Sequence, residues 1–281
     1  MTKAALGSHW TRWMATMVLA LAMSIGLAAC GGDDDDDDDD SGSMGDDDMG
    51  DDDAADDDAA DDDSGDDDTG DDDAEESFIR VIHLAPTTPA VDVYVNSATL
   101  AFEDIAFEEG TPYAALPPAT YDFQITLTGE TDPALEISDF AMAADTYYTA
   151  AAINETVEIL PVVDDYAALA EGNIRVRAIH AAAAVGEVDI WLIPDGDDPT
   201  PLWEDVPFKG VGEYLDVPAV ALTIGFDVDN DATPDVIFDI PALDAGTVAN
   251  VFAVSDDEDN VFLAAQLGDE AGTVVRIDPA I

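Results

Sequence analysis

The chain has 281 residues, and its 66 acidic residues outnumber its 7 basic ones, which gives a formal net charge of −59 at pH 7. Such a charge repels nucleic acids and anionic membrane surfaces, so it excludes nucleic acid as a partner. The sequence contains one cysteine, which excludes an internal disulfide framework. The folded part must therefore be stabilised by core packing alone.

The first residues have the pattern of an export signal. Lys3 and Arg12 form a basic segment, and the apolar run "WMATMVLALAMSIG" follows at residues 13–26. This run is shorter than the ~18–20 apolar residues that a membrane-spanning helix needs. A basic segment, a short apolar run and a small-residue exit are typical of a secretory signal peptide. We predict that residues 1–29 are a cleaved signal peptide.

The only cysteine follows this segment directly. Leu27-Ala28-Ala29-Cys30-Gly31 resembles the lipobox of bacterial lipoproteins. That resemblance implies a diacylglycerol on the Cys30 thiol and cleavage before Cys30. Several acyl chains give a stable anchor, at about 0.8 kcal/mol per buried CH₂. We expect a lipid-anchored protein of the bacterial cell envelope, at the outer membrane or the cell surface. The alternative is a plain signal peptide that Cys30 happens to follow.

Residues 30–76 carry an acidic repeat of low complexity. After a block of eight aspartates, an Asp triplet recurs every five residues, and residues 31–76 contain 26 Asp and 2 Glu. A segment with so little to bury and so much self-repulsion is expected to be disordered, so we interpret it as a spacer. A cation-buffering repeat is the alternative, because carboxylates suit Ca²⁺. The residues after 76 contain 38 acids and 5 bases, which leaves them about 33 negative.

The remainder contains two copies of one unit. "RVIH" at residues 80–83 matches "RAIH" at 177–180, and an Asp follows each histidine after nine residues. Aromatic and proline positions also match, at an offset that grows from 97 to 101. The second copy therefore has a four-residue insertion, which we place in "PDGDDPTP" at residues 194–201.

Short runs rich in β-branched and aromatic residues, bounded by turn residues, indicate strands in both copies. We predict an all-β fold with two tandem antiparallel β-sandwich domains of immunoglobulin or transthyretin type after the acidic linker. Repeat 1 is expected at residues 77–163 and repeat 2 at 173–281. Residues 164–172, "DDYAALAEG", are the expected connector, with a helical turn ending at Gly172.

Two family resemblances accompany these patterns. The lipobox, the acidic spacer and the paired R-x-I-H-x₈-D-[VI]-[YW] units resemble the tandem domain-of-unknown-function family 4397 of bacterial surface lipoproteins. The phrase "LPPATYDFQI" at residues 116–125 is similar to segments of transthyretin-like sandwiches, with Ala119 where glycine is usual. The resemblance implies a fold and a location, and it implies no activity.

The repeated histidines and aspartates are the first candidates for chemistry. His83 with Asp92, and His180 with Asp189, would lie across a turn, as half of a metal site or as an acid–base pair. We favour a structural role, in which the imidazole N–H donates to the carboxylate. The repeated aromatic residues are expected in the core; they are Phe107, Phe208, Tyr113, Tyr214 and Trp191.

The second candidate is the loop "DVDNDATPD". Asp227, Asp229, Asp231 and Asp235 fall at positions 1, 3, 5 and 9 of an EF-hand-like Ca²⁺ loop. Ala232 stands where that loop has glycine, and Phe238 stands where it has glutamate. A tight hairpin turn explains the segment equally well. No other cofactor is predicted.

Common enzyme motifs such as G-x-S-x-G, H-E-x-x-H and C-x-x-C are missing from the sequence. We therefore expect a non-enzymatic envelope lipoprotein, a surface binding or structural module for a protein or a polysaccharide. The alternatives are a calcium-binding or cation-sequestering surface protein and a hydrolase with an unrecognised site.

Overall fold

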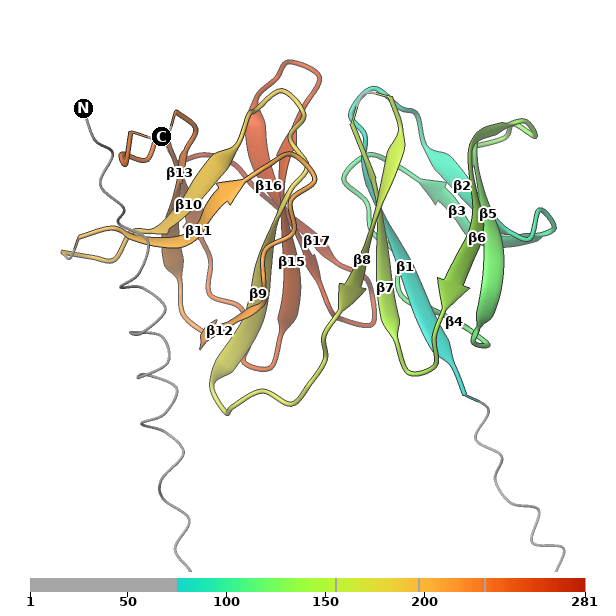
Figure 1. Ribbon diagram of the computed structural model, residues 1–281, viewed down its shortest axis with the longest axis horizontal. Coiled ribbons are helices and arrows are strands. Elements are labelled where there is room, and N and C mark those ends of the chain that lie inside the picture. Colours follow the sequence, from blue (N-terminus) through green and yellow to red (C-terminus); the bar gives the residue numbers. More distant parts are fainter. Residues whose placement is uncertain (1–74, 155, 197, 230, 281) are drawn as a thin grey trace, which may run out of the picture. The chain divides into compact units, whose positions relative to one another are not determined.

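The computed structural model describes residues 75–280 apart from 155, 197 and 230, and Figure 1 shows their course. Every named element in this part of the chain is a β-strand, so the predicted all-β class is confirmed. Within the same residues, no helix has the length and apolar character that crossing a membrane requires. The predicted signal peptide, Cys30 and nearly all of the acidic segment lie outside the described residues.

Repeat 1 consists of two four-stranded sheets. We call β4–β1–β7–β8 its inner sheet and β3–β2–β5–β6 its outer sheet. The strands are β1 (Ser77–Leu84), β2 (Val91–Val95), β3 (Thr99–Ile105), β4 (Ala114–Leu116), β5 (Ala119–Leu127), β6 (Pro133–Met142), β7 (Tyr147–Ile153) and β8 (Glu158–Asp164).

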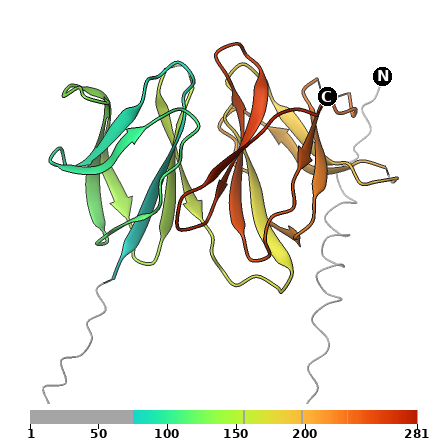
Figure 2. The same ribbon diagram turned by 180° about the vertical axis from the view of Figure 1, so that it is seen from behind.

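Repeat 2 has the same order of strands and one strand more. Its inner sheet is β12–β9–β15–β16–β17, and its outer sheet is β11–β10–β13–β14. The strands are β9 (Asn173–His180), β10 (Val188–Leu192), β11 (Thr200–Val206), β12 (Leu215–Pro218), β13 (Leu222–Asp227), β14 (Val236–Ile240), β15 (Val248–Ser255), β16 (Val261–Leu267) and β17 (Val274–Ile277). The additional strand, β17, is dark red in Figure 2 and pairs with β16.

Most neighbouring strands are antiparallel, as predicted, but both inner sheets are mixed. β1 pairs with β7 in parallel, and β9 pairs with β15 in parallel. A parallel pair needs a long connection between its strands. Here the connection contains all four strands of the outer sheet, so the chain of each repeat passes back and forth between its two sheets.

Three buried apolar clusters hold the sheets together. One fills repeat 1 between its sheets, and one fills repeat 2. The third joins the two inner sheets, with Ile82 and Leu84 of β1 against Ile179 of β9 and Phe252 of β15. Successive side chains of a strand point to opposite faces of its sheet. One face of β1 therefore packs into the core of repeat 1 and the other into the cluster between the inner sheets, so β1 is buried on both faces. The described residues accordingly belong to one compact unit.

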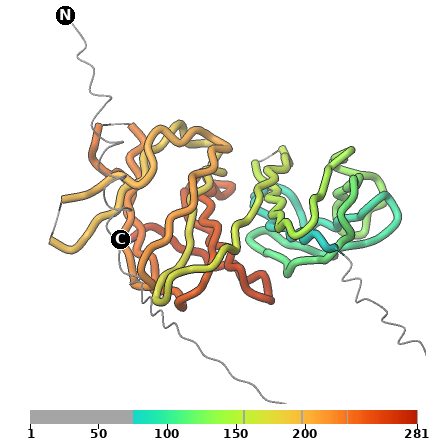
Figure 3. Tube along the Cα trace, turned by 60° about the horizontal axis from the view of Figure 1, so that its bottom comes forward, coloured from blue at the N-terminus to red at the C-terminus, as the bar shows by residue number. Residues whose placement is uncertain are grey.

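The connector between the repeats, which can be followed from β8 to β9 in Figure 3, differs from the prediction. Residues 165–170 have no regular structure, and a turn at 171–172 precedes β9. Gly172 has φ +82°, a left-handed conformation that suits glycine. The predicted helical turn is therefore wrong, and Asp164 is the last residue of β8 instead of the first of the connector.

The predicted insertion is confirmed. Residues 96–98 join β2 to β3, whereas residues 193–199 join β10 to β11, so the second loop is longer by four residues. The hairpins otherwise match, because Asp104 and Asp205 both have φ 54° at the same irregularity of register.

Candidate functional site

Both repeated histidines are buried at the ends of the first strands of their repeats. His83 is 0% exposed and His180 is 1% exposed. Nε2 lies 3.2 Å from the carbonyl oxygen of Pro89 in repeat 1 and 2.7 Å from that of Gly186 in repeat 2. Nδ1 accepts the backbone N–H two residues ahead in each repeat, at 3.2 Å and 3.3 Å. Each ring thus stabilises the turn that follows its own strand.

The aspartates paired with these histidines in the sequence have other partners. Asp92 accepts the backbone N–H of Asp104 at 2.8 Å and the hydroxyl of Thr128 at 3.2 Å. Asp189 accepts the N–H of Asp205 at 2.6 Å. The predicted hydrogen bond between histidine and aspartate is therefore wrong, because both ring nitrogens contact backbone atoms. The carboxylates instead fix the left-handed residues of the two hairpins.

Burial lowers the pKa of both histidines below the usual value of 6.5. In repeat 1 the backbone hydrogen bond to Pro89 and the charge of Glu109 oppose this shift. Each ring also contacts an aromatic side chain edge to face, at 6.3 Å for Phe107 and 6.2 Å for Phe208. These two phenylalanines pack against the apolar cluster between the inner sheets, so their predicted core position is confirmed.

The arginines of the repeated motif meet at one carboxylate. Asp164, whose side chain is 0% exposed, lies 2.9 Å from Nη2 of Arg177 and 3.7 Å from Nη2 of Arg80. The other ends of the guanidinium groups cross between repeats: Arg80 donates to the carbonyl of Leu267 at 2.6 Å, and Arg177 donates to that of Val163 at 3.0 Å. The two arginines thus share Asp164 as their counter-charge, and Arg177 is the closer of the two.

Further polar side chains complete this cluster. Thr149 donates to Asp164 at 2.5 Å and accepts from Arg80 at 2.9 Å. Its counterpart in repeat 2, Asn250, donates to Asp164 at 2.7 Å and accepts from Arg177 at 2.8 Å. We call Arg80, Thr149, Asp164, Arg177 and Asn250, with the two tyrosines described next, the Asp164 cluster.

The repeated tyrosines cover the two guanidinium groups. The Cζ atom of Arg80 lies 4.7 Å from the ring centroid of Tyr113, and that of Arg177 lies 4.3 Å from that of Tyr214. Both hydroxyls donate to Asp164, at 2.5 Å and 3.2 Å. Burial, and then the charge of Asp164, raise the pKa of each tyrosine above its usual value, so both remain neutral at pH 7. Tyr113 and Tyr214 were predicted to be core residues. In the structure their hydroxyls instead take part in a buried polar cluster.

The Asp164 cluster was only half visible in the sequence. The repeat identified the arginines and tyrosines, but Asp164, Thr149 and Asn250 were missed because they differ between the copies. The position that corresponds to Asp164 in repeat 2 is next to Leu267, where Gly268 leaves room for the ring of Tyr166: a Cβ there would lie 2.6 Å from its hydroxyl. The repeated arginines were the available signal, because a repeated cation in a strand of mostly apolar residues requires a buried partner.

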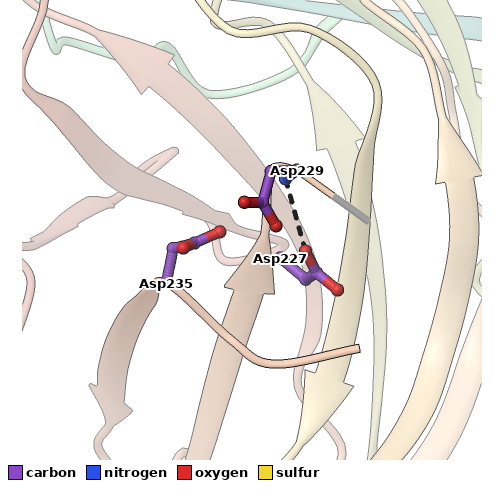
Figure 4. A group of neighbouring side chains, drawn as sticks. All are labelled: Asp227, Asp229 and Asp235. Carbon is purple, nitrogen blue, oxygen red and sulfur yellow. Dashed lines mark hydrogen bonds between the residues drawn. The ribbon is translucent and has the colours of Figure 1, made fainter. Parts of the chain in front are cut away.

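The acidic loop between β13 and β14 brings three of its four predicted residues together. One carboxylate oxygen each of Asp227, Asp229 and Asp235 lies within 4.8 Å of the others. Figure 4 shows these three side chains. Asp227 is fully buried, and it accepts the backbone N–H groups of Asp229, Asp231 and Ala232 at 3.3, 3.3 and 2.8 Å. Asp231 is not a member of the group.

The positions that depart from the EF-hand pattern have different consequences. Ala232 has φ 66°, so the backbone makes the left-handed bend there without a glycine. Phe238 is 0% exposed in the core of repeat 2, so the position of the bidentate glutamate is not available to a metal. The loop can offer three carboxylates, and Ca²⁺ takes six to eight oxygen ligands.

The carboxylates of this loop repel one another. The charge of Asp231, with smaller contributions from burial and from Asp235 and Asp227, raises the pKa of Asp229. A bound cation would remove this repulsion.

The fold and the buried polar contacts define the class of this molecule as an all-β protein of two sandwiches joined through a shared core. Residues 77–191 match the model of DUF4397, a domain of unknown function. The family resemblance seen in the sequence is thereby confirmed across repeat 1 and the first two strands of repeat 2.

Other comparisons add little. No curated protein matches the chain. A solved structure described as the Bacillus anthracis TIE protein is similar at 9% sequence identity and a TM-score of 0.21. The match covers 73% of this chain and 44% of that chain, so the present chain spans less than half of the matched one.

Proposed function

We propose that this protein is a lipid-anchored, non-enzymatic module of the bacterial cell envelope. In this proposal the lipid on Cys30 holds it to the membrane, the Asp-rich segment at residues 31–76 is a spacer, and the two sandwiches form the exposed head. The head binds an envelope protein or a polysaccharide, or supports the envelope structure.

One observation supports a non-enzymatic head. The polar residues that the two repeats share are the arginines, histidines, aspartates and tyrosines described above, and these are the residues most suited to catalysis. In the described residues, each of them contacts the backbone or a member of the Asp164 cluster. Their repetition is explained by architecture.

Membrane anchoring can be tested at Cys30. Wild-type protein in a bacterial host should incorporate a radioactive fatty acid and partition into the detergent phase, and Cys30→Ser should do neither. Cys30→Ser protein that stays in the membrane and is labelled as strongly as wild type would contradict the anchor.

A second candidate, calcium binding, is favoured by the group of Asp227, Asp229 and Asp235 in Figure 4. A ligand that binds only the folded state raises the melting temperature by mass action. Calcium should therefore raise the melting temperature of the full chain in a saturable way, and Asp229→Asn should abolish the shift. Asp257→Asn, in another exposed loop, is the matched control. An equal shift in both variants would assign the effect to diffuse binding by other carboxylates.

A further inference from the structure

Repeat 1 contains an apolar cavity between its two sheets. Its volume is about 350 Å³, which is in the range of small-molecule pockets. Side chains from both sheets line it, and the polar residues among them are Tyr148, Thr149 and Glu158; the apolar lining includes Phe102, Phe123, Ile137, Phe140, Ala150 and Ile159. The cavity lies on the side of β6 and β8, which are the outermost strands of their sheets at that side.

In repeat 2 the same side of the sandwich is closed by β17. This strand pairs with β16, Ile277 joins the core, and Ala280 donates its backbone N–H to Ile237 of β14 at 2.7 Å. The last segment of the chain thus bridges the edges of the inner and outer sheets. Repeat 1 has no corresponding strand among its described residues, because after β8 the chain continues through the connector to β9.

Exposure of matching residues shows the effect of this difference. Ala150 pairs with Pro161 in repeat 1, and Val251 pairs with Ala265 in repeat 2. Ala265 is buried under β17, whereas Pro161 is exposed. Two residues earlier, Leu263 is 0% exposed, whereas its counterpart Ile159 is only half-buried.

A smaller side chain at one position enlarges the space in repeat 1. Ala150 stands where repeat 2 has the larger Val251. Ile137 stands where repeat 2 has Phe238, but its strand partner Phe123 stands where repeat 2 has Ile224, so this pair is exchanged at about equal volume. Phe238 is 0% exposed and fills the interior of repeat 2, and the cavity there has a volume of only about 160 Å³. The change from valine to Ala150 leaves volume in repeat 1 that the chain itself does not fill.

The free edge of β8 is poorly suited to an added strand. Pro161 has no N–H to donate, and in sheets proline occurs on edge strands. The carbonyl of Val163 accepts a hydrogen bond from Arg177, as that of Leu267 in β16 does from Arg80, so Pro161 is the feature that distinguishes the edge of β8. A strand that paired with β8 as β17 pairs with β16 would find no N–H donor at Pro161, so the observations favour a small ligand over a peptide strand.

The negative charge of the protein around the cavity favours an uncharged ligand. Glu158, the charged residue of the lining, pairs with Lys209, and this hydrogen bond lowers its pKa, so it is ionised at neutral pH. The residues after 76 are together about 33 negative. An anionic amphiphile such as a fatty acid would be repelled from this surface, whereas an uncharged apolar molecule would not.

We propose that the cavity between β6 and β8 of repeat 1 binds an uncharged apolar small molecule, such as a hydrocarbon chain or an aromatic ring system. This inference names a ligand class for the proposed surface binding module and to that extent rests on the proposed function. It does not depend on the anchor, because every residue that carries it lies in the described part of repeat 1.

The test uses the neutral fluorescent probe N-phenyl-1-naphthylamine and the full chain with Cys30→Ser, so that no lipid on the protein competes. We expect saturable binding with one site. Ile137→Phe and Ala150→Val, which introduce the residues of repeat 2, should each raise the Kd at least about tenfold, with an unchanged or higher melting temperature. Ser138→Phe adds the same ring to the exposed face of β6 and should bind the probe like the parent protein.

Three results would overturn the proposal: no saturable binding by the parent protein, equal binding by both filled variants, or tighter binding of an anionic naphthalene sulfonate than of the neutral probe. A loss of binding in Ser138→Phe equal to that in Ile137→Phe would also contradict the assigned site. Fatty-acid labelling of wild-type protein tests the anchor separately, so a failure of the anchor and a failure of the cavity are distinguishable.

Discussion

At the scale of single residues, Asp164 has the largest expected effect on stability. Asp164→Asn keeps the shape of the side chain but leaves two buried guanidinium groups without their shared counter-charge. Breaking a buried ion pair from one side costs about 3–5 kcal/mol. We expect a loss of this size in the free energy of unfolding, measured by urea denaturation.

The adjacent residue provides the control for that measurement. Asp165 pairs with Arg175 at 3.1 Å, but its side chain is 52% exposed. Asp165→Asn should cost only about 0.2–1 kcal/mol, as exposed ion pairs do. Equal losses in the two variants would mean that the buried position of Asp164 has no special importance.

The two buried histidines predict a pH dependence. The pKa of each histidine is lowered in the folded state, whereas in the unfolded chain it is about 6.5. As the pH falls below 6.5, the unfolded chain therefore binds more protons than the folded protein does. The stability contributed by the neutral rings is complete above that pH and decreases as the pH falls below it. Between pH 7.5 and 5.5, wild type should therefore lose stability relative to the double variant His83→Gln, His180→Gln. Parallel melting curves against pH for the two proteins would contradict this assignment.

At the scale of elements, the loop between β16 and β17 is fitted closely to repeat 1. Gly272 has φ +66°, and a Cβ there would lie 2.0 Å from the carbonyl oxygen of Thr111. Gly272→Ala should therefore combine backbone strain of about 1–2 kcal/mol with a collision. Gly129 has φ +82° and open space, so Gly129→Ala should show the strain alone. Circular dichroism melts should place Gly272→Ala well below Gly129→Ala; equal melting temperatures would show that the loop yields freely.

The elements also differ in how far they could be predicted from the sequence. Alternating apolar residues and turn signals were sufficient to predict strands, and the offset of the repeats located the insertion between β10 and β11. The parallel pairing of β1 with β7 could not be predicted, because a strand buried on both faces reads as "FIRVIHLA" whatever the direction of its neighbour. The spacing of apolar residues in the connector suggested a helical turn, but residues 165–170 have no regular structure, and the ring of Tyr166 packs against Tyr113 and Tyr147.

The same reasoning applies to the candidate sites. Asp227, Asp229 and Asp235 were predicted from local spacing, since one hairpin turn brings them together. The contacts of the Asp164 cluster join residues 13 to 101 positions apart in the sequence, and spacing carries no information over the longer of these separations. The predicted hydrogen bond between histidine and aspartate is wrong because backbone atoms of the turn, and not the aspartate side chain, are the partners of both ring nitrogens.

At the scale of the whole molecule, the two repeats share a core and a buried polar cluster. Separating residues 77–170 from 173–281 would expose the cluster of Ile82, Ile179 and Phe252, and it would leave Arg177 without Asp164. The size of each repeat alone favours independent folding, but the structure predicts that each half melts at a markedly lower temperature than the full chain or fails to fold. Two halves that each melt at the temperature of the full chain would contradict the shared core.

Differential scanning calorimetry of the full chain tests the central claim, that the two repeats form one body joined at Asp164, most directly. The structure predicts a single transition whose calorimetric and van't Hoff enthalpies agree, as expected for one cooperative unit. In Asp164→Asn this transition should move to lower temperature as a whole or divide into two. Two separate transitions in the wild-type protein, unchanged by Asp164→Asn, would contradict the claim.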